Sequence, residues 1–285
     1  MMPTTGSDRP VRPFPAPPQD FVLPGILSVE GPKSTYLPLV FDSPHSGLEI
    51  PEDFNPAVGP KDVLISADTH VDDLFSSAPD CGAPLLRAHF PRSFLDPNRS
   101  LLDMDVEMIG GDWPHAVGQS PTARRGMGLM WRYCWGDTLM HTQPLSVSEA
   151  EGRIARYWQP YHRALRELLD AAYERFGRVG SDGASAARPD ICIGDLHGTS
   201  AGREFVDVVA KTLEGEGLTV GLNTPFRGAE LARAYANPSI GRHSIQFEIN
   251  RRLYMDEATR ERTENYQTFK AAITRLNHTL ADYVA

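Results

Sequence analysis

Apolar residues recur at helical spacing along two long stretches of the chain. Residues 149–176 place Ile154, Tyr157, Trp158, Tyr161, Leu165, Leu168, Leu169 and Tyr173 on one face. Residues 260–284 do the same with Tyr266, Phe269, Ile273, Leu276, Leu280 and Tyr283. Both patterns predict long amphipathic helices that pack on a core, and residues 68–77 and 201–213 predict two shorter helices.

Between these helical patterns lie short apolar runs that are typical of strands. Residues 38–47 and 191–198 both begin with such a run and end in a histidine beside small residues, His45 and His197. Residues 244–250 alternate polar and apolar positions, which predicts a half-buried strand that carries Glu248, and residues 218–222 predict a further strand. Strands that alternate with helices predict an α/β fold with a mixed, mainly parallel sheet flanked by helices on both faces.

Proline and glycine mark the irregular parts of the chain. Residues 1–20 are rich in proline and predict a loose N-terminal arm, followed by a single α/β domain over residues 21–285. Residues 177–189 predict a surface loop. Residues 103–144 show no clean period, and long irregular segments of this kind tend to line functional sites.

Composition narrows the classes of function. The 285 residues carry a formal net charge of −9, which argues against a nucleic-acid or acidic-membrane partner and requires local arginines for any anionic substrate. The three cysteines have no C-x-x-C spacing, which excludes a thiolate zinc cage and fits a reducing cytoplasm. No long apolar stretch or signal pattern is present, so we expect a soluble, cytoplasmic protein.

The two histidines suggest a metal site. Ligands of open α/β sheets bind at the carboxyl ends of strands, so His45 and His197 could converge although they are far apart in sequence. Two imidazoles, nearby carboxylates and Glu248 on a strand are the components of a zinc hydrolase. Each residue alone is more often structural, so the hypothesis depends on their occurring together.

Six ordered blocks over residues 37–257 resemble the N-formylglutamate amidohydrolase family. The blocks are Pro44-His45-Ser46-Gly47, Asp68-Thr69-His70-Val71-Asp72-Asp73-Leu74-Phe75, Pro91-Arg92-Ser93-Phe94-Leu95-Asp96-Pro97-Asn98-Arg99, Asp195-Leu196-His197-Gly198, Asn223-Thr224-Pro225-Phe226-Arg227-Gly228 and Gln246-Phe247-Glu248-Ile249-Asn250-Arg251-Arg252-Leu253-Tyr254-Met255. The resemblance implies a fold similar to zinc carboxypeptidases and aspartoacylases. It also implies a metal-dependent hydrolysis of N-formyl-L-glutamate to formate and L-glutamate, a reaction of histidine degradation.

The resemblance further implies one zinc ion held by His45, His197 and a carboxylate. In the wider group of relatives a glutamate follows the first histidine by three residues, but this chain has Leu48 there. Asp68 and Asp72 are four residues apart on one predicted helical face, so either could reach His45. Both therefore remain candidate metal ligands.

Substrate and catalytic roles also follow from the resemblance. Asn98 and Arg99 resemble a pair that holds a terminal carboxylate, and a planar guanidinium suits that task. Arg92 is the candidate to polarise the scissile carbonyl, and Arg227 the candidate for the side-chain carboxylate. Glu248 is the candidate general base.

Two other functions stay open. The chain could be a deacylase of another N-acyl amino acid, because a formyl group offers little to recognise. It could also be a non-catalytic protein that binds zinc and a carboxylate, although such a protein gains nothing from Glu248. A nucleotide-binding module has no support, since neither phosphate-binding glycine motif occurs. The sequence leaves the oligomeric state undetermined.

Overall fold

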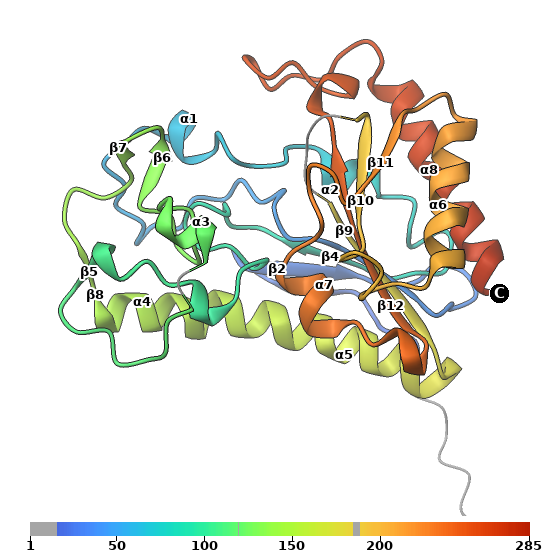
Figure 1. The fold of residues 1–285 in the computed structure, drawn as a ribbon, viewed down its shortest axis with the longest axis horizontal. Helices are drawn as coiled ribbons and strands as arrows, with labels where there is room; N and C mark the ends of the chain where they lie inside the picture. Colours follow the sequence, from blue (N-terminus) through green and yellow to red (C-terminus); the bar gives the residue numbers. More distant parts are fainter. Residues whose placement is uncertain (1–15, 119, 185–188) are drawn as a thin grey trace, which may run out of the picture.

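A mixed eight-stranded sheet runs through the molecule (Figure 1). The computed structural model describes residues 16–118, 120–184 and 189–285. In sheet order, the strands are β1 (Phe21–Leu23), β2 (Leu27–Glu30), β4 (Leu85–Ala88), β3 (Leu39–Ser43), β9 (Val179–Ala184), β12 (Arg242–Ile249), β10 (Ile191–Gly194) and β11 (Val220–Leu222). Strands β4, β3, β9 and β12 are parallel neighbours, and β10 is antiparallel to β12. The predicted mixed, mainly parallel sheet is therefore confirmed.

Helices cover both faces of this sheet. Successive residues of β3 point to opposite faces, so that Val40 packs in one core and Leu39 and Phe41 pack in the other. The first core includes α5 (Gln159–Phe176), and the second includes α2 (Val71–Leu74), α6 (Arg203–Gly215) and α8 (Tyr266–Val284). Among the described residues, no helix is both long and apolar enough to cross a membrane.

The predicted helix over residues 149–176 is confirmed as three consecutive helical segments. These are α4 (Val147–Arg153), a π-helical turn η3 (Ile154–Trp158) and α5. Ser146 accepts a hydrogen bond from the backbone of Glu149 at the start, and Gly177 ends the helix with φ 70°. The predicted helices at 201–213 and 260–284 correspond to α6 and α8, and the helix predicted at 68–77 shortens to α2.

Two predictions about strands were wrong. The predicted loop at residues 177–189 contains β9, which lies between β3 and β12 in the middle of the sheet. Gly180 is buried there, and a Cβ atom on it would lie 3.2 Å from the Leu39 side chain, so glycine serves close packing rather than a turn. Strand β12 is buried from Ser244 to Ile249 rather than half-buried, because it is flanked by β9 and β10.

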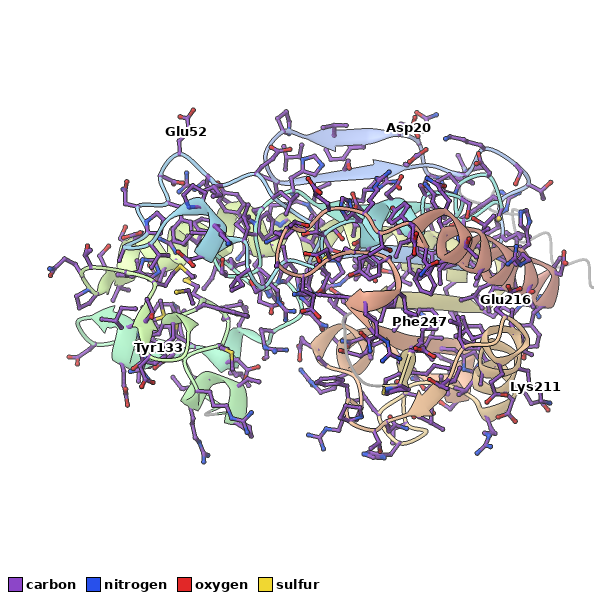
Figure 2. The ribbon with its side chains drawn as sticks, turned by 90° about the horizontal axis from the view of Figure 1, so that it is seen from above. Asp20, Glu52, Tyr133, Lys211, Glu216 and Phe247 are labelled. Carbon is purple, nitrogen blue, oxygen red and sulfur yellow. The ribbon has the colours of Figure 1, made fainter. Side chains whose placement is uncertain are left out.

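The irregular segment at residues 103–144 forms a lobe of short elements beside α4. Figure 2 shows Tyr133 of this lobe at one end of the molecule and Lys211 of α6 at the other. The short elements here and elsewhere are α1 (Pro60–Val63), η1 (Leu101–Asp103), η2 (Val106–Met108), β5 (Ile109–Gly110), α3 (Pro121–Arg124), β6 (Tyr133–Trp135), β7 (Thr138–Leu139), β8 (Leu145–Ser146), α7 (Glu230–Tyr235), η4 (Pro238–Ile240) and η5 (Arg251–Leu253).

Most of the predicted N-terminal arm, residues 1–15, lies outside the described residues. Residues 16–20 form no helix or strand, and Asp20 accepts a hydrogen bond from the backbone of Gly31. The division into an arm and one domain stays a prediction.

Candidate active site

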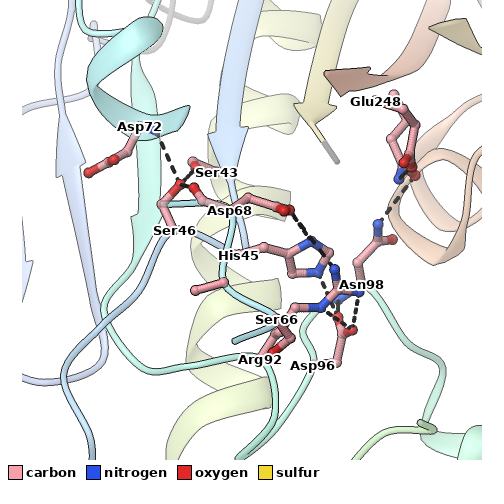
Figure 3. Close-up of polar contacts among 12 residues, drawn as sticks. Ser43, His45, Ser46, Ser66, Asp68, Asp72, Arg92, Asp96, Asn98 and Glu248 are labelled. Atoms are coloured by element: carbon pink, nitrogen blue, oxygen red, sulfur yellow. Dashed lines mark hydrogen bonds and ion pairs between the residues drawn. The ribbon is translucent and has the colours of Figure 1, made fainter. Parts of the chain in front are cut away.

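Three parallel strands deliver predicted site residues to the same edge of the sheet. His45 follows β3, the segment of Arg92, Asn98 and Arg99 follows β4, and Glu248 lies near the end of β12. Because these strands run in the same direction, their carboxyl ends lie at one edge of the sheet, and Figure 3 shows His45, Arg92 and Asn98 grouped there, with Glu248 nearby. Gly47 lets the chain after β3 pass close to the chain after β4, since a Cβ atom there would lie 2.3 Å from the carbonyl oxygen of Phe90.

His45 lies between two buried carboxylates. Its Nε2 atom is 2.8 Å from Oδ1 of Asp96, and its Nδ1 atom is 3.4 Å from Oδ2 of Asp68. The loop of Asp68 is fixed against His45, because the Asp68 amide donates to the His45 carbonyl and the Ser46 hydroxyl donates to the Asp68 carbonyl. Burial and Arg92 lower the pKa of His45, but the two carboxylates more than offset them and raise it.

Two atoms of this pair lack a hydrogen bond. His45 Nδ1 and Asp68 Oδ2 are both buried and unsatisfied, and they face each other. The other oxygen of Asp68 accepts from Nη2 of Arg251 at 3.1 Å. Burial raises the pKa of Asp68, but the neighbouring His45 and the charges of Arg92 and Arg251 lower it overall, so the carboxylate is ionised. Nitrogen and oxygen donors of this kind suit a divalent metal such as zinc.

Asp72 is placed differently from Asp68. Its backbone amide donates to the Ser46 hydroxyl, while its carboxylate points away from His45 (Figure 3). Of the two candidate carboxylate ligands, the structure therefore brings only Asp68 beside His45.

His197 does not join this group. It follows β10, which runs antiparallel to β3 and is separated from it by β9 and β12, so the carboxyl ends of the two strands point to opposite edges. The structure therefore does not bring His45 and His197 together at one edge of the sheet, as the sequence suggested. The His197 side chain is exposed, and among the described residues no three His, Cys, Asp or Glu side chains are grouped closely enough to hold a metal.

The turn that carries His197 is tightly bonded nevertheless. Leu196 and His197 have φ of 53° and 57°, in the left-handed region that non-glycine residues rarely adopt. Asp195 accepts from the amide of Gly198 at 2.9 Å and from the side chain of Asn223 at 2.6 Å. Asp195 therefore stabilises the turn and the neighbouring Asn223.

Arg92 is held by Asp96 and by an aromatic ring. Its Nε and Nη2 atoms donate to Asp96 Oδ2 at 3.1 and 2.7 Å, and its guanidinium lies over the ring of Trp131 at 5.7 Å. Burial alone would lower the pKa of Arg92, but Asp96 and Asp68 raise it, so the side chain stays charged. One carboxylate, Asp96, thus orients both His45 and Arg92.

A cavity of about 430 Å³ is lined by all five residues predicted to act in catalysis or substrate binding, which are Arg92, Asn98, Arg99, Arg227 and Glu248. Its described lining consists of Arg92, Asn98, Arg99, Thr122, Met127, Trp131, Asn223, Pro225, Phe226, Arg227, Gly228, Ala229, Gln246 and Glu248. Three arginines and one carboxylate therefore face the same space, and the lobe at residues 103–144 supplies part of the wall, as the sequence predicts. A cavity of this size and charge suits a small anionic molecule.

A chain of amide contacts links three of the lining residues. Asn98 Nδ2 donates to Gln246 Oε1 at 3.2 Å, and Gln246 Nε2 donates to Glu248 Oε1 at 2.7 Å. Asn98 Oδ1 accepts from the amide of Leu231. Glu248 itself is 4% exposed, so its carboxylate lies in a largely desolvated position at the cavity wall.

Sequence reasoning missed the roles of Asp96, Gln246 and Trp131. Asp96 lies in the same block as Arg92 and Asn98, and Gln246 is two positions from Glu248 on a strand, which places both on one face. These spacings in the sequence could have indicated that Asp96 and Gln246 belong to the site. Trp131 lies in the irregular lobe, where no period indicates the direction of a side chain.

Comparison with known proteins identifies the family. Residues 37–255 match the family model described as N-formylglutamate amidohydrolase. The N-formylglutamate deformylases of Pseudomonas putida and Pseudomonas aeruginosa are 28% and 29% identical over 245 residues, which cover 78% of this chain and 83% of each relative. The crystal structure of N-formylglutamate amidohydrolase from Ralstonia eutropha JMP134 is 37% identical, covers 91% of this chain and 98% of that one, and superposes with a TM-score of 0.89. The chain therefore belongs to the N-formylglutamate amidohydrolase family.

Proposed function

We propose that this protein hydrolyses the amide bond of N-formyl-L-glutamate and releases formate and L-glutamate. The observation that carries the proposal is the cavity in which Arg92, Arg99 and Arg227 face the same space as Glu248. The net charge of −9 would repel a dianion, so local arginines are what such a substrate requires. The names of the relatives from Pseudomonas and Ralstonia agree with this activity.

The arginines divide the recognition of the substrate among them. Arg99 forms a charge-assisted pair with the α-carboxylate, and the rigidly held amide of Asn98 fixes its direction. Arg227, on the exposed side of the cavity, pairs with the side-chain carboxylate. Arg92 lies beside the scissile carbonyl, where its charge stabilises the oxyanion that develops during attack.

Glu248 acts as the general base and then as the general acid. Its carboxylate accepts a proton from the attacking water and passes that proton to the leaving amine nitrogen. Gln246 holds one oxygen of Glu248, so the carboxylate keeps a fixed direction throughout the reaction. The same residue then serves both proton transfers without rotating.

His45 and Asp68 fit a divalent metal, because each directs an unsatisfied buried atom toward the other. We propose that these two residues hold one zinc ion, and the assignment of His197 as the third ligand stays a prediction from the sequence. When bound, the metal would lower the pKa of a water molecule toward neutrality and polarise the carbonyl. Asp96 would keep the His45 ring in the tautomer whose Nδ1 lone pair is free to bind.

We also infer a role in histidine degradation in the cytoplasm. The three cysteines are buried and free, which fits a reducing compartment. In the cytoplasm the protein would encounter N-formylglutamate as a product of amino-acid breakdown.

The test is release of the free amino acid, together with formate or acetate, from a substrate panel by purified protein of known metal content. The panel contains N-formyl-L-glutamate, N-formyl-L-aspartate, N-formyl-L-glutamine and N-acetyl-L-glutamate. We expect N-formyl-L-glutamate to have the highest kcat/KM and the activity to fall on chelation and return with zinc. A higher kcat/KM for N-acetyl-L-glutamate would indicate a deacylase of another class, and binding without turnover would indicate a non-catalytic protein.

A further inference from the structure

A stack of side chains supports the turn that carries Asn98 and Arg99 from behind. The π-helical turn η3 ends at Trp158, and the indole ring of Trp158 stacks on the imidazole of His162 with a centroid distance of 3.6 Å and an interplanar angle of 19°. Tyr235 at the end of α7 also contacts this imidazole, with 5.8 Å between the ring centroids. π-Helical turns inside α-helices occur frequently near functional sites.

This stack binds the backbone of the turn at two points. Trp158 Nε1 donates to the carbonyl oxygen of Arg99 at 3.0 Å, and His162 Nε2 lies 2.8 Å from the carbonyl oxygen of Pro97. A carbonyl oxygen only accepts, so the His162 proton must be on Nε2. The stacked rings of Trp158 and His162 therefore fix the carbonyls of Pro97 and Arg99, the residues before and after Asn98.

Tyr235 supports the form of His162 that carries its proton on Nε2. Burial lowers the pKa of His162 to about 4, so the ring is neutral near pH 7 and has a single N–H. With the proton on Nε2, Nδ1 is an acceptor, and the Tyr235 hydroxyl lies 2.7 Å from it. The hydroxyl is also 3.2 Å from the His162 carbonyl, but the shorter contact to Nδ1 makes the ring nitrogen its main acceptor.

The opposite side of the same turn is held by the site itself. The Asn98 amide donates to Asp96 Oδ1, and the Asn98 side chain binds Gln246 and the amide of Leu231. Leu231 and Tyr235 both belong to α7, so this short helix contacts the turn directly and through His162. Of the described residues that line the cavity, none is Trp158, His162 or Tyr235, so these three act on the cavity only through the backbone that they bind.

We propose that Trp158, His162 and Tyr235 are positioning residues for the substrate-carboxylate clamp, because they fix the Pro97 and Arg99 carbonyls and so aim the Asn98 and Arg99 side chains. The clamp role of Arg99 rests on the proposed function. The positioning role itself rests on the two carbonyl contacts. Loss of either contact frees the turn without removing a group from the cavity.

The first test compares three variants. Trp158→Phe keeps an aromatic ring over His162 but removes the donor to Arg99, and Tyr235→Phe removes the hydroxyl that supports the proton on His162 Nε2. Tyr157→Phe is the matched control, since it removes a hydroxyl from the same π-helical turn while its ring packs on Phe90 and Phe94. We expect KM for N-formyl-L-glutamate to rise about 10-fold in Trp158→Phe and several-fold in Tyr235→Phe, with kcat within about 2-fold of wild type, as for the loss of one hydrogen bond. Tyr157→Phe should keep the wild-type KM.

The second test measures the turn without any substrate. Hydrogen–deuterium exchange should become faster in peptides that contain residues 97–100 in Trp158→Phe and Tyr235→Phe, and stay unchanged in Tyr157→Phe. Wild-type KM in both variants, or wild-type exchange at residues 97–100, would overturn the inference. If the wild-type protein does not hydrolyse N-formyl-L-glutamate, the proposed function fails, and the exchange measurement still decides whether the stack holds the turn.

Discussion

Asp96 Oδ1 lies 2.8 Å from Nε2 of His45, and both side chains are at most 1% exposed. A buried carboxylate in this position keeps the proton of a neutral imidazole on Nε2 and leaves the Nδ1 lone pair toward Asp68. The pKa of Asp96 is held well below its ordinary range, since the charges of Arg92, His45 and Arg99 more than offset its burial. Asp96 is therefore ionised near neutral pH and acts only as an acceptor.

The first prediction concerns this pair. Asp96→Asn presents an amide whose N–H can donate to His45 Nε2, which moves the imidazole proton to Nδ1 and blocks the lone pair. We expect zinc affinity to fall roughly 10- to 100-fold, the range found for partners of metal-binding histidines. Competition with a chelator measures the affinity, and the exposed Asp62→Asn serves as the control. Wild-type affinity in Asp96→Asn would mean that His45 does not bind the metal through Nδ1.

The second prediction separates the two candidate carboxylate ligands. Asp68→Asn before α2 and Asp72→Asn within α2 each remove one negative charge, but only Asp68 directs an oxygen at His45. We expect metal content, measured by mass spectrometry of purified protein, to be lost in Asp68→Asn and in His45→Ala and kept in Asp72→Asn. A zinc-loaded His197→Ala protein would remove His197 from the ligand set, while an empty one would support it.

Particular residues show what the sequence could predict and what it could not. The strand-end argument was made for His45 and His197, and the structure places only His45 near Arg92 and Glu248, because β3, β4 and β12 run in one direction. It failed for His197, because β10 runs the opposite way and the direction of a strand leaves no mark in its own apolar pattern.

Local conformation explains why the sequence did not separate Asp68 from Asp72 and did not predict β9. Asp68 and Asp72 seemed equivalent because both were placed on one helix, but α2 begins at Val71 and His70 has φ 72°, so Asp68 lies outside the helix. Strand β9 was missed because its glycine-rich sequence resembles a loop, whereas the strand is defined by backbone pairing with β3 and β12, which are distant in sequence.

The third prediction tests the division of the two carboxylates between arginines. Arg99→Ala should raise KM for N-formyl-L-glutamate about 100-fold, because a charge-assisted pair with the α-carboxylate is lost. Arg227→Ala should weaken N-formyl-L-glutamate binding but leave KM for N-formyl-L-glutamine nearly unchanged, since glutamine has no side-chain charge. Steady-state kinetics with both substrates checks the assignment, and equal losses for the two substrates in Arg227→Ala would contradict it.

The fourth prediction concerns stability in acid. Burial lowers the pKa of His162 from its ordinary value near 6.5 to about 4, so between these values the unfolded chain binds a proton that the folded protein does not. The free energy of unfolding therefore falls as the pH drops from about 6.5 to about 4, by on the order of 3 kcal/mol for this residue. His162→Gln cannot titrate there, so its urea unfolding free energy should depend less steeply on pH than that of wild type. The comparison uses the slope of the unfolding free energy against pH and not its absolute value, because the substitution also removes a stacked ring. Equal slopes for the two proteins would exclude a neutral buried His162.

The fifth prediction separates an enzyme from a binding protein. Glu248→Gln keeps the shape of the side chain but cannot accept a proton, so kcat for N-formyl-L-glutamate should fall roughly 10²- to 10⁴-fold. Zinc content, thermal stability and the dissociation constant of the substrate should stay close to wild type, because the residue lies beside the cavity and is not one of the proposed metal ligands. Gln246→Ala is the companion variant, since it keeps the base but removes the 2.7 Å hydrogen bond that orients it, and it should lower kcat by a smaller factor. A fully metallated Glu248→Gln protein with near-normal kcat would assign the base to another residue. The next residues to substitute would then be Glu49, whose side chain is exposed, and Asp72, whose carboxylate points away from His45.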